Sequence, residues 1–409
     1  MVPVKKCDSY TYLGFVFKPS GSVGAGVQEL LSKANRAYYS ISNILYQNKK
    51  MKVDTAMELF DMTVLPVALY SVEHWGVLSL PTSSFQTKEM LLRAWESFSP
   101  ETINQKLCRL LLSCHKKSSR LAMLGELGRY PVVLKSLAQT IKYKWSLMSR
   151  VNDGSMVSDA VSEMLDNDAW DTWLSRTNKV EKLLNISVNC KKTSDGVGKY
   201  TKQKIRSCFD IFWKEEISAS KLDKDGVGHN KLRLYSKVKS SFTREPYIDI
   251  VQSRNQRSWI SRLRSSSSRL GIEIGRYKNI HLASRICKHC STEKIDDEYH
   301  FLMFCPIFEL KRACFFGKLS SIIPNFPSLS EEDKFRVILC PTSEISTKVI
   351  NKYIRIMFNA RDNLDNGVTK SCYPTYTPPF DFSPNDNFDQ FSDIDEAEAS
   401  YSSADTSIT

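Results

Sequence analysis

Four candidate metal ligands constrain this chain more than any other feature of its sequence. Cys287 and Cys290 are separated by two residues, and His300 and Cys305 follow a short distance further along the chain. Two thiolates at this spacing can hold one ion from a tight turn, and an imidazole and a third thiolate then complete a tetrahedral set. Four protein ligands leave no open coordination position. The pattern therefore predicts a small module built around a structural Zn²⁺ ion.

The same residues admit other interpretations. Cys287 and Cys290 have the spacing of a redox pair, although no βαβ pattern surrounds them. They could also be inert buried thiols, which is what we expect of Cys314, Cys340 and Cys372. His289 is an alternative nitrogen donor, but it lies between the paired cysteines, where it would strain the turn. Of these interpretations, only a zinc site gives a role to all four residues, Cys287, Cys290, His300 and Cys305.

Charge is unevenly distributed along the 409 residues. The chain has 57 Lys and Arg against 45 Asp and Glu, a formal net charge of +12. Residues 371–409 contain eight acids and no Lys or Arg, so the preceding 370 residues carry +20. A basic body of this size indicates a polyanionic partner. The hydrophobic fraction of 42% excludes a wholly disordered chain, and the length suits two or three domains.

The densest basic segment is 228–278, which contains twelve Lys or Arg and three acids. The scarcity of acids favours a nucleic-acid interface over a solvated helix face. Trp259 within it is expected to stack on a base or, more in keeping with its type, to join the core. The residues expected to contact nucleic acid are Arg254, Arg257, Arg262, Arg264, Arg269, Arg276 and Lys278.

The periodicity of apolar residues predicts a mainly α fold. A short N-terminal β element at residues 10–17, one strand and a turn, precedes the helices. A helix beginning at Val53 is expected to end or kink at Pro66. Loops are expected at 152–155 and 192–198, and a domain joint at 226–229. Helical spacing is found at 27–45, 53–65, 103–112, 132–148, 169–184, 200–217 and 349–358.

No catalytic site is evident in the sequence. A polymerase needs carboxylates placed to hold two divalent ions, and Asp296-Asp297 lacks the preceding aromatic residue that a reverse transcriptase uses. We therefore expect Asp296 and Asp297 to form a solvated turn. The glycine-rich stretch 21–26 lacks the Lys-Ser/Thr of a phosphate-binding loop, and no Gly-x-Ser-x-Gly motif occurs.

Other features bear on compartment and partners. No apolar run approaches the length of a membrane span, and no secretory signal is recognisable, so no membrane association is expected. Eleven cysteines without secretory features favour a reduced intracellular compartment, either nucleus or cytoplasm. The acidic segment at the C-terminal end of the sequence is expected to be a disordered tail. Its aromatic residues are a candidate docking motif for a protein partner.

Several short motifs, in this order, resemble non-LTR (LINE-type) retrotransposon reverse transcriptases. The likeness extends over residues 9–360 and is weakest at 152–226. Before the cysteines it rests on Tyr12-Leu-Gly14 with Phe15-Val-Phe17, Ser20-Gly-Ser22, Lys33-Ala-Asn-Arg36, Leu59-Phe-Asp61, Val64-Leu-Pro66, Leu69-Tyr70, Glu73-His-Trp-Gly76, Leu124–Pro131, Asn230–Arg233 and Arg269–Tyr277. The pattern Cys-x2-Cys … Glu-x-His-x4-Cys-Pro is matched by Cys287, Cys290, Glu298, His300, Cys305 and Pro306.

The resemblance implies a C-terminal part of such an enzyme: a thumb-like helical region plus a zinc-binding module. The polymerase palm with its aspartates has no counterpart, so the resemblance implies a fragment that begins after the catalytic core. The expected divisions are a thumb-like region at 1–150, a helical connector at 151–227 and a basic nucleic-acid-binding segment at 228–280. The zinc module with C-terminal helices is expected at 281–362, and the disordered acidic tail at 363–409.

Three functions are compatible with these observations. The favoured hypothesis is a non-catalytic protein that binds RNA or an RNA/DNA hybrid and has no enzymatic activity on its own. The second is a zinc-stapled helical scaffold for protein interactions. The third is part of a polymerase that a separately encoded palm completes in trans.

Overall fold

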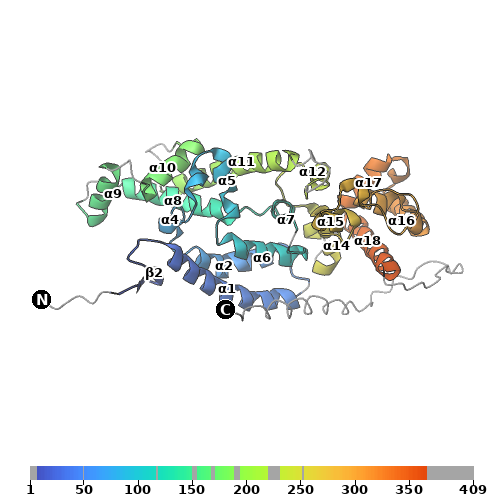
Figure 1. Cartoon of the computed structure of the whole chain (residues 1–409), viewed down its shortest axis with the longest axis horizontal. Coiled ribbons are helices and arrows are strands. Elements are labelled where there is room, and N and C mark those ends of the chain that lie inside the picture. Colours follow the sequence, from blue (N-terminus) through green and yellow to red (C-terminus); the bar gives the residue numbers. More distant parts are fainter. Residues whose placement is uncertain are drawn as a thin grey trace. The chain divides into compact units, whose positions relative to one another are not determined.

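Nearly all regular structure in the described part of the chain is helical, as the sequence predicts (Figure 1). The computed structural model describes residues 7–48, 50–116, 118–149, 154–166, 171–187, 194–219, 231–250 and 253–365. Its α-helices are α1 (Gly24–Gln47), α2 (Val53–Thr63), α3 (Leu65–Ala68), α4 (Val72–Trp75), α5 (Lys88–Arg93), α6 (Glu101–Leu112), α7 (Arg120–Leu127), α8 (Val132–Met148), α9 (Met156–Asp166), α10 (Trp173–Leu183), α11 (Ser194–Ala219), α12 (Tyr235–Val238), α13 (Pro246–Ile250), α14 (Arg254–Arg264), α15 (Gly271–Tyr277), α16 (Glu309–Ile322), α17 (Glu331–Leu339) and α18 (Glu344–Asp365). Shorter turns are η1 (Thr82–Phe85), η2 (Ala94–Glu96), η3 (Leu282–Ser284), η4 (His300–Phe304), η5 (Pro306–Phe308) and η6 (Phe326–Ser328).

The N-terminal β element is a hairpin rather than the single strand expected. β1 (Tyr10–Tyr12) pairs antiparallel with β2 (Phe15–Phe17), with Tyr12 opposite Phe15. The two turn residues, Leu13 and Gly14, both have positive φ, 47° and 84°. Turns of this kind match the twist of a two-residue hairpin. A leucine in the left-handed region is rare, and so the turn was not recognisable from the sequence.

The long predicted helices are confirmed, but α11 begins six residues earlier than expected, and α18 begins five residues earlier and ends seven residues later. The helix starting at Val53 ends at Thr63, and a new turn, α3, contains Pro66 near its start, as the proline requires. The expected loop at 192–198 is wrong from Ser194 onward, because α11 begins there. The expected joint at 226–229 lies outside the described residues, as does the chain after Asp365.

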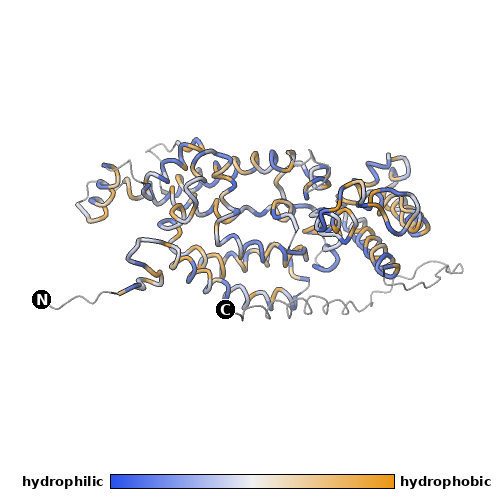
Figure 2. Tube along the Cα trace, in the orientation of Figure 1, coloured by the Kyte–Doolittle hydropathy of each residue, from blue (hydrophilic) through white to orange (hydrophobic). Residues whose placement is uncertain are grey.

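α1 is an amphipathic helix that packs on β2, α2, α3 and α6. Apolar and polar residues recur along it at helical spacing (Figure 2). Its buried side includes Val27, Leu30, Tyr38 and Leu45, which join the common hydrophobic core. The opposite side of α1 is polar and aromatic, and it faces solvent.

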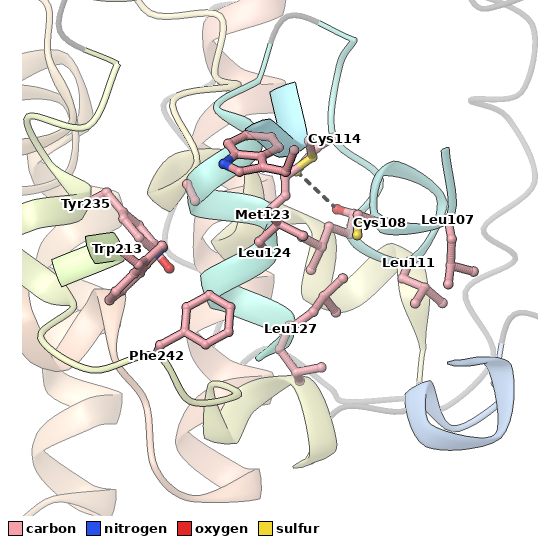
Figure 3. Packing of buried hydrophobic residues seen from close by; sticks show 14 of the residues in the cluster. Leu107, Cys108, Leu111, Cys114, Met123, Leu124, Leu127, Trp213, Tyr235 and Phe242 are labelled. Carbon is pink, nitrogen blue, oxygen red and sulfur yellow. Dashed lines mark hydrogen bonds between the residues drawn. The ribbon is translucent and has the colours of Figure 1, made fainter. Parts of the chain in front are cut away.

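α7 contributes several large side chains to the centre of the core. Figure 3 shows its labelled residues Met123, Leu124 and Leu127 among side chains of other elements. These include Leu107 and Leu111 of α6, Trp213 of α11 and Tyr235 of α12. A Cβ atom at Gly125 would lie 2.5 Å from both the Trp213 and Tyr235 side chains, so only glycine permits this approach. Packing therefore explains the glycine at position 125 of the motif 124–131.

Described residues as far as Asp362 belong to one compact unit. α8 packs along α11, α14 packs against α6 and α17, and η4 packs against α16 and α17. The Tyr353 hydroxyl of α18 donates to the Leu302 carbonyl of η4 at 3.0 Å. The five divisions expected from the sequence stay predictions. Among the described residues, no helix combines the length and hydrophobicity that crossing a bilayer requires.

Candidate metal centre and the basic segment

The four predicted ligands come together at one point. One donor atom each from Cys287, Cys290, His300 and Cys305 lies within 4.8 Å of the other three. The Cys290 Sγ and His300 Nε2 atoms are 3.4 Å apart. Ligands about 2.0–2.3 Å from a shared ion are themselves roughly 3.3–3.8 Å apart in a tetrahedron, so small side-chain movements would suffice. This cluster could hold a metal ion, and it uses His300 rather than His289.

A short β-like hairpin presents the first two ligands. Ile286 and Ile295 form an isolated antiparallel bridge, and the Cys287 amide donates to the Lys294 carbonyl at 2.8 Å. The chain between these residues turns back on itself, which brings the Cys290 side chain close to that of Cys287. Cys287 is 3% exposed, whereas Cys290 is partly open to solvent.

The other two ligands flank one turn of π-helix, η4. The Asp297 carboxylate accepts from the His300 amide at 2.8 Å and so fixes the start of the turn. At its end, the Cys305 amide donates to the His300 carbonyl at 2.8 Å. Phe301 and Leu302, between the ligands, are buried in the core. This apolar stretch therefore packs inward while His300 and Cys305 contribute donor atoms to the four-ligand cluster, except that Phe304 is 46% exposed.

The pKa shifts of the three cysteines and of His300 are those expected of a site that holds a cation. Burial raises the pKa of Cys287 and raises that of Cys305 to about 12. Burial opposes ionisation of Cys290 too, but hydrogen bonds from Thr292 lower its pKa overall. Burial lowers the pKa of His300, which keeps the imidazole neutral and able to donate a lone pair. Clustered thiolates are therefore unfavourable here unless a cation compensates their charge.

Two neighbouring expectations are wrong. Asp296 is 1% exposed and forms an ion pair with Arg361, so it is a buried structural residue rather than part of a solvated turn. Its burial was not predictable because the partner lies 65 positions further along the chain. Cys314 is exposed on α16, not an inert buried thiol, whereas Cys340 is partly buried. Cys372 lies outside the described residues.

The structure buries four of the seven residues expected to contact nucleic acid, and this corrects the prediction for them. Arg264 is fully buried and pairs with Glu126 at 2.8 Å and with Glu245 at 2.9 Å. Arg257 is 2% exposed, and its Nε donates to the Leu111 carbonyl at 3.1 Å. A guanidinium enclosed in this way joins helices together and cannot reach a phosphate.

The other two buried arginines, Arg254 and Arg276, also contact side chains of the protein. Arg276, 5% exposed, pairs with Glu273 one turn earlier on α15. Arg254, 7% exposed, stands over the ring of Tyr46 on α1, 4.5 Å from its centroid. The sequence shows the charge of Arg254 and Arg276 but not that each side chain is buried against a partner, Tyr46 and Glu273 respectively.

Three predicted contacts remain accessible. Arg269 and Lys278 are exposed, and Arg262 is partly exposed with its Nε donating to the Ser113 carbonyl at 2.7 Å. Trp259 stacks on Phe358 of α18 with ring centroids 5.7 Å apart, which confirms its place against the core.

A second basic surface was missed, although its signal is in the sequence. Residues 30–53 contain five Lys or Arg and no acid, and the same is true of residues 102–125. The first segment forms most of α1 and the second most of α6, and the two helices pack together. An open depression of about 600 Å³ lies where Arg36 and Tyr39 of α1 face Lys106 of α6. We call this surface the α1–α6 face.

Comparison with known protein families, with characterised proteins and with solved structures finds no match to this chain.

Proposed function

We propose that this chain is a non-catalytic nucleic-acid-binding protein whose α1–α6 face contacts the phosphate backbone. The observation that supports it most is that two acid-free segments, each with five Lys or Arg, run through two packed helices, with Arg36 on α1 and Lys106 and Arg109 on α6. Such a surface attracts a polyanion without requiring a specific sequence. The proposal includes no catalysis, because the sequence supplies no paired carboxylates for two-metal chemistry.

Lys106, the central cation of the α1–α6 face, is held in place by neutral partners. The Lys106 ammonium donates to the Asn35 side-chain carbonyl at 2.8 Å and lies 3.3 Å from the Tyr39 hydroxyl. No carboxylate is among these contacts, so its charge is available to a ligand. Arg36 is exposed at the rim of the depression. Arg109 lies one helical turn beyond Lys106 on α6.

The ion that suits the four-ligand cluster best is Zn²⁺, in a structural role. Three sulfurs and one imidazole form a closed set of soft and borderline donors. With this set, the ion would tie the 285–296 hairpin to η4 and so stabilise the module that carries Arg269 and Lys278 at its border. The resemblance in motif order supports an origin as the C-terminal part of a non-LTR retrotransposon reverse transcriptase.

One observation favours the alternative, a protein-interaction scaffold. Phe304 at the end of η4, Ile307 in η5 and Leu310 at the start of α16 are 46%, 47% and 70% exposed. Exposed apolar side chains of this size are typical of protein contacts when they gather in one patch. The two functions predict different responses to salt, since apolar contacts are little affected by it.

The proposal is tested by comparing single-stranded RNA binding between the parent protein and a variant with Arg36→Gln, Lys106→Gln and Arg109→Gln. The matched control replaces three exposed lysines of α11: Lys199→Gln, Lys202→Gln and Lys214→Gln. Both variants lose the same charge. We expect the α1–α6 variant to bind at least about tenfold more weakly than the control. Equal affinity of the two variants would remove the α1–α6 face from consideration.

A further inference from the structure

Two exposed tyrosines lie on the outer side of α1. Tyr39 is 58% exposed and Tyr46 is 51% exposed. They are seven residues apart, so they share one side of the helix at a separation of about 10.5 Å along its axis. Asn43, between the two tyrosines, and Arg36, one turn before Tyr39, are also exposed and lie on the same side of the helix. This arrangement leaves two aromatic rings and a cation in one row.

Each ring is held by a cation from another helix. The Lys106 ammonium of α6 stands 5.1 Å from the centroid of the Tyr39 ring. The Arg254 guanidinium of α14 stands 4.5 Å from the centroid of the Tyr46 ring. Contacts of this kind orient an aromatic side chain, while the measured exposure shows that much of each ring remains open to solvent. The row is therefore built from three helices and is not a chance feature of α1 alone.

We infer that these tyrosines stack on the bases of single-stranded nucleic acid, with Arg36 and Lys106 neutralising its phosphates. Sites for single strands combine a cationic groove with aromatic side chains on which bases stack. Bases in a duplex are already stacked within the helix, so the same tyrosines would gain nothing from double-stranded RNA. An acidic peptide would satisfy the cations but has no planar bases for the rings. This inference rests on the proposed function and names its ligand as an unpaired strand.

The test is a variant with Tyr39→Ala and Tyr46→Ala in the full chain. The probes are an oligouridylate, an RNA duplex and an abasic phosphodiester strand of equal length. Both side chains are more than half exposed, so folding should survive, and circular dichroism checks this. We expect oligouridylate affinity to fall on the order of 10–100-fold, with little change for the abasic strand or the duplex. The slope of affinity against salt should stay the same, because no charge is removed.

Two further variants make the result specific. Tyr39→Phe with Tyr46→Phe keeps both rings and should restore binding to within about twofold of the parent. Tyr10→Ala with Tyr12→Ala removes two tyrosines of comparable exposure, 62% and 56%, from the hairpin and should leave binding unchanged.

The outcomes separate this inference from the proposed function. If the alanine variant binds oligouridylate as the parent does while the Arg36, Lys106 and Arg109 variant is weakened, the face binds phosphates only and the stacking inference fails. An equal loss on the abasic strand, or competition by polyglutamate as strong as by oligouridylate, also overturns it. If the parent binds none of the probes at low salt, the proposed function fails as well.

Discussion

The Asp296 carboxylate and the Arg361 guanidinium form a two-point ion pair in the module that carries the four-ligand cluster. Arg361 Nη1 donates to Oδ1 at 2.9 Å, and Nη2 donates to Oδ2 at 2.5 Å. The side chains are 2% and 3% exposed. Asp296 also accepts from the Gly271 amide at 2.6 Å, so one carboxylate joins α15, the ligand-bearing hairpin and α18.

Removing one partner of this pair should strongly destabilise the protein. Arg361→Met leaves Asp296 charged and buried without its partner, which costs about 3–5 kcal/mol of the free energy of unfolding. Urea denaturation measures the change. The control is Lys348→Met, which breaks an exposed pair with Glu344 on the same helix and should cost less than about 1 kcal/mol. Equal costs for the two variants would show that the Asp296–Arg361 pair has no structural role.

A second comparison separates buried from exposed arginines of the basic segment. Arg264→Gln leaves Glu126 without its main buried partner and should lower the free energy of unfolding by about 3–5 kcal/mol. Arg269→Gln changes an exposed side chain and should alter stability by less than about 0.5 kcal/mol. A variant with Gln at 257, 262, 264 and 269 is expected to unfold rather than to report on nucleic-acid binding. If Arg264→Gln is as stable as Arg269→Gln, the buried network is not important for folding.

These arginines show how far the sequence can be interpreted by itself. Local periodicity predicts helices such as α8 at their observed bounds, and ligand spacing predicts the Cys287–Cys305 cluster, because both signals lie within a short window. Arg264 is buried because it pairs with Glu126, which lies 138 positions away in the sequence. No local sequence pattern contains that partner. The acid-free runs behind the α1–α6 face were visible, but only the packing of α1 on α6 unites them.

Metal binding should be stoichiometric and dependent on the four ligands. Native mass spectrometry of the parent is expected to show one Zn²⁺ per chain. Cys290→Ser with His300→Ala should abolish stoichiometric zinc, since two of four ligands are lost. Cys314→Ser, which removes an exposed cysteine outside the cluster, is the control and should retain one ion. A double variant that still binds one zinc would refute the ligand assignment.

Glu273 should make stability depend on pH. Burial, together with the nearby Glu298 carboxylate, raises the pKa of Glu273 to about 7 against the opposing effect of Arg276. The folded state therefore holds the proton more tightly than the unfolded state, whose pKa is 4.5. Its contribution to stability is fully present below pH 4.5 and is lost as the pH rises through about 7, by at most about 3 kcal/mol.

Urea denaturation of zinc-loaded protein between pH 5 and 8 checks this dependence. Glu273→Gln cannot ionise, so the parent should become less stable relative to this variant as the pH rises. Glu344→Gln, an exposed acid of α18, serves as the control and should show no such trend. A constant difference between parent and Glu273→Gln across the range would contradict the shifted pKa.

Deleting residues 371–409 should strengthen binding to a polyanion at low salt. The deletion removes eight acids and raises the formal net charge from +12 to +20, which increases long-range attraction. Filter binding with single-stranded RNA at low and at high salt measures the effect, which should shrink at high salt because the added ions screen it. An unchanged affinity at low salt would show that these acids do not influence the interface.

The most direct test of the nucleic-acid proposal is a salt titration of single-stranded RNA binding. Each phosphate contact contributes about −0.7 to the slope of log affinity against log salt concentration. We expect a steep negative slope for the parent. The variant with Arg36→Gln, Lys106→Gln and Arg109→Gln should have a slope flatter by about 2. A parent slope near zero, or the same slope in both proteins, would contradict phosphate binding by the α1–α6 face.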